Sequence, residues 1–179
     1  KNIAVKKYST RVLPVKSVGV QGDERSYQHP LAVQTSYAAA SAVHKLAHTL
    51  TNKHRNINRV ILELTGNNLA NGKCHSAFIT RARVALLQQA DAIVTRELRR
   101  SGMYYKMWQC PVVLLPFGFK HQESIVIRPF SSREAMTGQA YILPPATVKR
   151  IMCGLKKLKA FDYIFYDLTD KPPGTVEWE

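Results

Sequence analysis

Acidic residues are scarce in this sequence, and long apolar runs are missing. The 179 residues include 12 Asp and Glu against 26 Lys and Arg, which gives a formal net charge of +14. No stretch approaches the roughly 20 consecutive apolar residues that a membrane helix requires. Residues 1–7 lack both an initiator Met and the apolar run of a signal peptide. We therefore expect no membrane association, and we interpret the chain as an internal fragment of a longer protein.

Cysteines are also few. Cys74, Cys110 and Cys153 are odd in number and widely spaced, and no metal-ligand pattern connects them. This usage is typical of reduced thiols in a cytoplasmic protein, and Cys110, which precedes a proline and an apolar run, predicts a buried structural thiol. His44 and His48 lie one helical turn apart without a Glu or Cys ligand, so we expect a solvated helix face and no metal site.

The common catalytic loops are absent. The sequence contains no Gly-x-x-x-x-Gly-Lys-Ser/Thr phosphate loop, no Gly-x-Gly-x-x-Gly and no Gly-x-Ser-x-Gly nucleophile elbow. We therefore expect no catalytic residue in this chain. A binding role stays open, because a basic surface favours an anionic partner, whether nucleic acid or a phosphorylated small molecule. A basic surface that serves solubility, or that faces a missing acidic domain, is the alternative.

The chain repeats itself loosely. An apolar segment at 12–20 has a counterpart at 113–119, and the segment at 57–65 has one at 161–169, in the same order along the chain. Such a repeat is typical of two copies of one small unit. We therefore divide the chain into a first unit, 1–65, and a second part, 66–179.

Each unit is expected to contain two strands, a helix and a final strand. Short β-branched and apolar runs predict strands at 12–20, 30–35, 57–64, 112–117, 124–130 and 161–168. Apolar residues at helical spacing predict helices at 39–50 and 144–158, and a long helix over 76–101 that ends at Gly102. The expected fold is α+β, with two tandem small β-β-α-β units joined by the long helix and helices packed on one face of each sheet.

Two polar segments are candidates for ligand binding. The first, 19–27, lies between two predicted strands, and its glycines allow a ligand to approach the backbone. Arg25 offers a planar fork that matches phosphate, while Asp23 can accept hydrogen bonds; a hairpin loop with an internal Asp–Arg pair is the alternative. The second is 170–179, where two prolines lower the entropy cost of ordering and Trp178 favours a docked tail over a frayed one.

At these two segments the chain resembles the C-terminal domain of GMP synthases. That family carries a Val-Lys-Ser-Val-Gly-Val-x-Gly-Asp-x-Arg-x-Tyr stretch, found here at 15–27, and ends in Lys-Pro-Pro-x-Thr-x-Glu-Trp-Glu, found here at 171–179. In bacterial members both motifs lie on one short unit. Here a second unit intervenes, which resembles the longer, eukaryotic-type enzymes. Glu134 and Ala135 depart from the Asp-Phe that the family tends to have there.

The resemblance implies a function. GMP synthases are ligases of purine biosynthesis that amidate xanthosine monophosphate (XMP) to GMP. ATP and magnesium activate the purine, and a glutamine amidotransferase domain supplies the ammonia. The signatures of the glutaminase and ATP-pyrophosphatase domains are absent from this sequence. The resemblance thus implies a dimerisation and XMP-binding region that is inactive alone, has no cofactor of its own, and works in the cytoplasm as a homodimer with the missing N-terminal domains.

The resemblance also implies site residues. We assign the XMP phosphate to Arg25 and Lys171, and hydrogen bonds to ribose or base to Asp23, Gln109 and Glu177. Three further residues are second-rank candidates: Lys16, Tyr27 and Thr175. We also predict that the tail folds back over the 19–27 segment and completes the phosphate pocket.

A tandem KH-like nucleic-acid-binding module is the alternative, because it too would consist of two small, basic α+β units. KH recognition requires a Gly-x-x-Gly loop between helices, and the sequence lacks this tetrad in that position. An exposed pair of aromatic strands for base stacking is missing as well. We therefore expect a nucleotide, and not a nucleic acid, as the partner.

Overall fold

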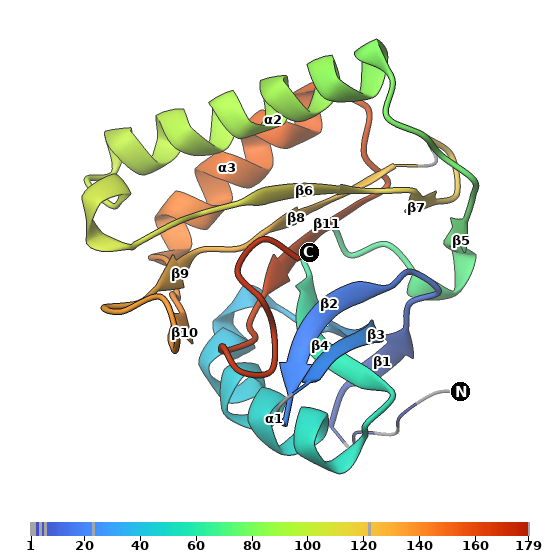
Figure 1. The fold of residues 1–179 in the computed structure, drawn as a ribbon. Helices are drawn as coiled ribbons and strands as arrows, with labels where there is room; N and C mark the ends of the chain where they lie inside the picture. Colours follow the sequence, from blue (N-terminus) through green and yellow to red (C-terminus); the bar gives the residue numbers. More distant parts are fainter. Residues whose placement is uncertain (1–2, 4, 6, 23, 122, 179) are drawn as a thin grey trace.

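The computed structural model of this protein describes residues 3, 5, 7–22, 24–121 and 123–178. Within them, three α-helices and eleven strands form an α+β fold, as predicted (Figure 1). The helices are α1 (Ala40–Lys53), α2 (Arg81–Arg100) and α3 (Pro145–Lys157). The strands are β1 (Ser9–Val12), β2 (Ser17–Gln21), β3 (Glu24–Gln34), β4 (Ile57–Glu63), β5 (Lys73–Cys74), β6 (Val112–Leu115), β7 (Phe117–Gly118), β8 (Ser124–Ile127), β9 (Phe130–Ser131), β10 (Gln139–Ala140) and β11 (Tyr163–Asp167).

Strands from both halves of the chain join in one mixed sheet. Its order is β1-β3-β4-β11-β8-β6, and β2 pairs with β3 beside this path. Strand β3 is parallel to β4 and β11 is parallel to β8, while β4 and β11 are antiparallel to each other. The order is thus symmetric about the β4–β11 pair. The two units share a sheet instead of having one each, and the division at residue 65 stays a prediction.

The two faces of the sheet are covered differently. Side chains alternate across a strand, so Val60 and Leu62 face one side while Ile61 faces the other. The first side packs against apolar residues of all three helices. The second side is covered by connecting segments and by the C-terminal segment, including Leu13, Phe117 and Trp178. Helices on one face are therefore confirmed, and the tail belongs to the opposite face.

Several predicted element boundaries differ from the structure, and two of these differences have a clear local cause. The strand predicted at 12–20 is interrupted around Pro14, because proline cannot donate to a strand ladder, and it becomes β1 and β2. The long helix begins at Arg81 and not at 76, since Thr80 caps it by accepting a hydrogen bond from Arg83 N at 3.2 Å. Its end at Gly102, with φ of 69°, is as predicted.

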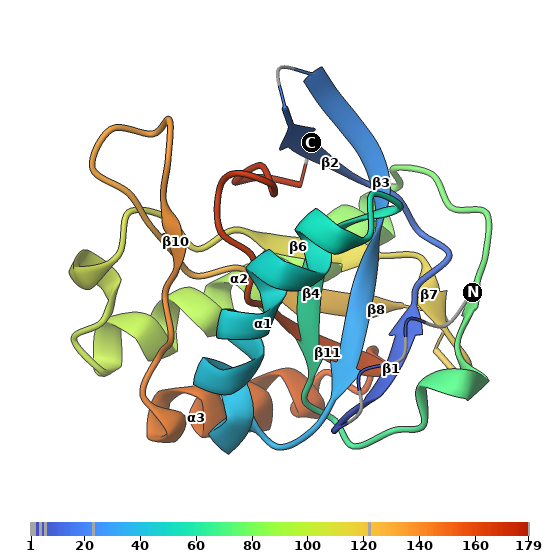
Figure 2. The same cartoon turned by 90° about the horizontal axis from the view of Figure 1, so that it is seen from below.

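The hairpin of β2 and β3 extends beyond the rest of the sheet, and the C-terminal segment lies close to it (Figure 2). Segments far apart in the sequence thus lie side by side. In the described part of the chain, no helix combines the length and the apolar character needed to cross a membrane.

Candidate functional site

The C-terminal tail, 171–178, lies along the edge of β2 (Figure 1). The amide of Val20 donates to the carbonyl of Pro173 at 2.7 Å, and the amide of Val18 donates to the carbonyl of Trp178 at 2.9 Å. The tail therefore adds to the sheet edge through backbone hydrogen bonds. The prediction that the tail folds back over the first polar segment is confirmed.

Two glycines permit this close approach. A Cβ atom on Gly19 would lie 2.5 Å from the carbonyl oxygen of Pro173, and one on Gly174 would lie 3.0 Å from Nη1 of Arg59. Atoms this close cannot be accommodated without a shift of the backbone or of a buried side chain. Both positions therefore require glycine for the tail to dock as it does.

Three charged side chains are buried beneath the tail: Arg59 at the start of β4, Arg128 just after β8, and Asp167 at the end of β11. We call this group the buried triad. Oδ2 of Asp167 lies 3.0 Å from Nη1 of each arginine. These three positions meet because β11 runs parallel to β8 and antiparallel to β4.

The buried triad holds the tail directly. Arg59 Nη2 donates to the carbonyl and the hydroxyl of Thr175 at 2.9 and 2.7 Å, and Arg128 Nε donates to the carbonyl of Val176 at 2.9 Å. The indole Nε1 of Trp178 donates to the triad carboxylate at 2.8 Å, and the Arg59 guanidinium lies 4.8 Å from the centre of the Trp178 ring. Hydrogen bonds to charged groups are about twice as strong as neutral ones, so the buried triad holds the end of the tail firmly.

The buried triad carries a surplus positive charge. Burial raises the pKa of Asp167, but the neighbouring Arg128 and Arg59 lower it further, so the carboxyl pKa lies below its ordinary value and the group stays ionised. Burial lowers the pKa of Arg59, and Asp167 opposes this shift. One carboxylate cannot accept all the N–H groups of two guanidiniums. The tail carbonyls therefore supply acceptors that these buried cations need.

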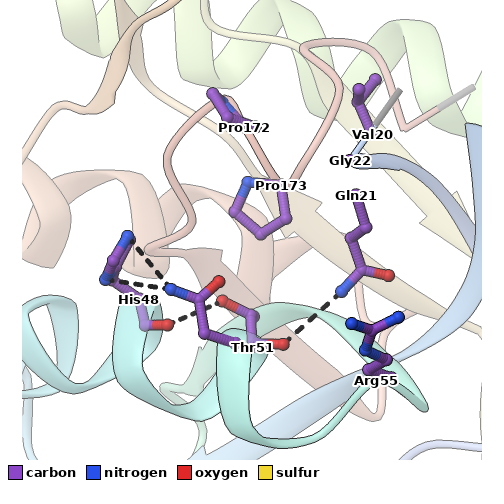
Figure 3. A pocket seen from close by; sticks show the side chains of 9 residues that line it. Val20, Gln21, Gly22, His48, Thr51, Arg55, Pro172 and Pro173 are labelled. Atoms are coloured by element: carbon purple, nitrogen blue, oxygen red, sulfur yellow. Dashed lines mark hydrogen bonds between the residues drawn. The ribbon is translucent and has the colours of Figure 1, made fainter. Parts of the chain in front are cut away.

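Two hollows lie on either side of Pro172. The first has a volume of 280 Å³ and lies between the β2–β3 turn, α1 and the two prolines of the tail (Figure 3). Figure 3 shows Gln21 pointing toward α1, where its Nε2 donates to the carbonyl of Thr51 at 3.5 Å. The same nitrogen donates to the carbonyl of Ile57 at 3.1 Å. Arg55, just after α1, also lines this hollow. Its lining combines polar side chains, including the Arg55 guanidinium, with the apolar Val20 and the two prolines.

The second hollow has a volume of 540 Å³, within the range of small-molecule sites. Two cations, Lys171 and Arg133, and two carboxylates, Glu134 and Asp170, line it, and Pro172 lines both hollows. The Lys171 backbone is fixed by two hydrogen bonds with Gly138, at 2.9 and 3.0 Å, while its Nζ donates to the carbonyl of Ala135 at 2.8 Å. The predicted phosphate-binding lysine thus lines a hollow of suitable size.

The hairpin candidates are exposed. Arg25 is paired with Val20, and Tyr27 with Val18, so their side chains lie on the opposite face of the hairpin from Gln21. Arg25 is on the second strand from the tail, which is about 10 Å at the usual strand spacing. Lys16, just before β2, is exposed as well, and Asp23 lies outside the described residues.

The remaining candidates differ in their surroundings. The Thr175 hydroxyl already accepts from Arg59 and donates to the carbonyl of Val18 at 3.0 Å, while the Glu177 side chain is exposed. Gln109 lines a separate hollow of 530 Å³ at the end of α2. The structure thus places the tail beside β2, whereas Lys16, Arg25 and Tyr27 line neither of the two hollows that Pro172 lines, and Gln109 lies outside both.

His44 differs from the expected solvated helix face. Its Nε2 lies 2.7 Å from Oδ1 of Asp170, just before the tail. This hydrogen bond raises the pKa of His44, against burial, which lowers it. The three cysteines form no disulfide, as predicted, and burial raises the pKa of the partly buried Cys110 thiol.

Sequence reasoning missed the buried triad. Each of its members follows or interrupts an otherwise apolar strand: Arg59 stands within 57–62, Arg128 follows 125–127, and Asp167 follows 163–166. A charged residue in a run that is otherwise buried requires a partner. Opposite charges in three such runs were the signal that could have found this group.

The amino-acid sequence is similar to proteins of known function. Residues 96–178 match the family of the GMP synthase C-terminal domain. A probable GMP synthase (glutamine-hydrolysing) of Leptospira interrogans is 38% identical over 174 residues, which cover 96% of this chain and 29% of that protein. A probable GMP synthase of Caenorhabditis elegans is 32% identical over 96% of this chain and 26% of its own length. A GMP synthase of Nocardia farcinica is 40% identical over 56% of this chain and 21% of its own length.

These matches identify the C-terminal domain of the GMP synthase family in this sequence. The chain belongs to this family, with residues 96–178 as the matched domain, and the predicted resemblance is confirmed. It spans less than a third of the length of the curated relatives named above. The nearly full-length match to a bacterial relative shows that the long arrangement is not confined to eukaryotes.

Proposed function

We propose that this chain is the XMP-binding part of a GMP synthase, and that it holds the nucleotide while domains outside it form GMP with ATP, magnesium and glutamine. Family membership supports the reaction. The observation that carries the site is the docking of the tail beside the hairpin, because the two segments that resemble the family's motifs lie far apart in the chain.

The charges near the tail suit a phosphorylated nucleotide. Lys171 and Arg133 line the hollow beside Pro172, and His48 stands between both hollows. A phosphate dianion can replace the single carbonyl partner of Lys171 Nζ with a charge-assisted hydrogen bond. Arg25 is exposed on the face of the hairpin opposite Gln21, so its proposed contact requires the nucleotide to extend past β2. Glu177 offers an exposed acceptor for ribose or base.

Catalysis by this chain consists of positioning. A purine that is held at a fixed distance from an activated phosphate reacts as if at high effective concentration. The buried backbone pairing of the tail provides the rigidity that this role demands. We assign ATP and magnesium to the preceding domains, because the phosphate-binding loop signatures are missing from this sequence.

Equilibrium binding of XMP to the full-length protein tests the proposal. Charge-assisted hydrogen bonds contribute about 1.5–3 kcal/mol, so Lys171→Ala or Arg25→Ala should weaken XMP binding about tenfold or more. Removing residues after Asp170 should have at least this effect. Lys157→Ala, which removes an exposed cation from α3, is the matched control and should leave XMP affinity unchanged. Unchanged affinity after the tail deletion would refute the proposed site.

A further inference from the structure

We propose that Arg59, Arg128 and Asp167 are positioning residues: the buried triad sets the docked conformation of the end of the tail, and thereby places Glu177 for the nucleotide. This inference rests on the proposed function, because it deepens the account of the same site. None of the three side chains touches the ligand in this scheme. They act through the tail backbone and through Trp178.

The contacts between the buried triad and the tail involve the last residues of the tail. Arg59 and Arg128 donate to the carbonyls of two consecutive residues, Thr175 and Val176, and Trp178 donates to the triad carboxylate. These three tail residues surround Glu177 in the sequence. The backbone before and after Glu177 is thus fixed by buried groups.

Burial on both sides orients the Glu177 side chain. Val176 and Trp178 are 2% and 5% exposed, whereas Glu177 is exposed. The chain bends at Val176 and Glu177, and the inward anchoring of Val176 and Trp178 leaves the Glu177 side chain on the solvent side. The triad therefore sets a direction as well as a position.

The other end of the tail has its own anchors. The Lys171 backbone pairs with Gly138, and Asp170 accepts hydrogen bonds from His44 and from the Ala140 amide at 2.7 and 2.9 Å. None of these contacts involves the triad. A lesion in the triad should therefore release the end that carries Glu177 first, and the tail should remain attached at Asp170.

Docking and charge burial depend on each other. Arg59 Nε and Arg128 Nη2 already lack a partner in the described part of the chain. Undocking the tail would remove the carbonyl acceptors of Thr175 and Val176 as well, so that Arg59 would keep only the Val18 carbonyl and Arg128 only the Thr169 carbonyl beside the shared carboxylate. Buried unpaired charge is strongly unfavourable. This penalty favours one docked conformation over an ensemble of tail positions.

Two variants of the full-length protein test the inference. Trp178→Phe keeps a buried ring and removes the N–H that Asp167 accepts, and Arg128→Lys keeps the charge and removes the fork that reaches Val176. Arg83→Lys is the matched control, since Arg83 forms a two-point pair with Glu123 outside the tail. Two properties should be measured: the release of C-terminal residues by carboxypeptidase, followed by mass spectrometry of the intact protein, and steady-state kinetics with XMP.

We expect Trp178→Phe and Arg128→Lys to release the terminal residues at least about fivefold faster and to raise the XMP KM about tenfold. The kcat at saturating XMP should stay within about twofold, because a positioning role changes binding before chemistry. Fold damage would lower kcat and raise the KM for glutamine as well. Arg83→Lys should behave as wild type in every measurement.

Three outcomes separate this inference from the proposed function. Wild-type digestion of both variants would show that the triad does not hold the tail, and the inference would be wrong. Faster digestion with an unchanged XMP KM would also overturn it. If Lys171→Ala likewise left the XMP KM unchanged, the proposed nucleotide site itself would fail. A clear effect of Lys171→Ala beside silent triad variants would reject the inference alone.

Discussion

Replacing Asp167 by asparagine should destabilise the protein more than any single exposed substitution. The carboxylate is fully buried and lies 3.0 Å from two guanidinium nitrogens and 2.8 Å from the Trp178 indole nitrogen. Asparagine is nearly isosteric with aspartate, so the change removes charge without creating a cavity. Two buried cations would then lack a counterion, a situation that costs about 3–5 kcal/mol. This is a large share of the roughly 5–15 kcal/mol that stabilises a typical domain.

Urea unfolding of the 179-residue chain measures this loss. With a slope of about 2 kcal/mol per molar urea, the midpoint should fall by about 2 M without a change in slope. Glu123→Gln, which breaks the partly exposed pair with Arg83, is the control and should cost less than about 1 kcal/mol. The lowered pKa of Asp167 means that its stabilisation is complete above its unfolded pKa and is lost as pH falls through the folded pKa. A loss below about 1 kcal/mol for Asp167→Asn would refute the reasoning.

Further predictions concern the tail, its first anchor and the chain as a whole. Gly174→Ala should raise the XMP KM and lower the urea midpoint, because its methyl group would press on Arg59; a wild-type midpoint would show that the tail can shift freely. The raised pKa of His44 means that its pairing with Asp170 stabilises fully below the unfolded pKa of about 6.5 and is lost as pH rises through the folded pKa, so the stability of wild type minus that of His44→Gln should decline as pH rises above about 6.5. The isolated chain should neither form GMP nor hydrolyse glutamine, as radiometric assays with XMP, ATP, magnesium and either ammonia or glutamine will show. We also expect self-association in light scattering, with Phe78→Asp, at a side chain 77% exposed, as a first probe of the interface; a monomer at every concentration would contradict this.

The sequence predicted the elements well where periodicity was strong. The helices around Val43 and Ile151 were found from apolar spacing, and Gly102 correctly marked the end of the long helix. Strand boundaries were less accurate because Pro14 splits one apolar run into two strands. The shared sheet could not be predicted, since the pairing of β4 with β11 depends on contacts about a hundred residues apart, which no local pattern encodes.

The candidate site was predicted from family motifs more than from the charge and burial of its residues. The tail and the hairpin were correctly expected to meet, and Lys171 lines a hollow of suitable size. Thr175 was proposed for its hydroxyl, which the structure shows is already paired with Arg59 and Val18. The buried triad was missed because charged residues are normally interpreted as exposed. Its three members also come from three neighbouring central strands, whose arrangement could not be read from the sequence.

The pairing of the tail with β2 joins residues such as Val18 and Thr175, which are 157 positions apart in the chain. During synthesis the hairpin and the arginine at position 59 emerge long before the segment that supplies their last acceptors. Folding therefore cannot finish until that segment has been made, and this long-range contact is among the last to form. A product that stops before Thr175 would keep its apolar core yet lose the Thr175 and Val176 acceptors of its two buried guanidiniums. The cell's proteases should degrade such incomplete chains, so only chains synthesised through the tail should accumulate.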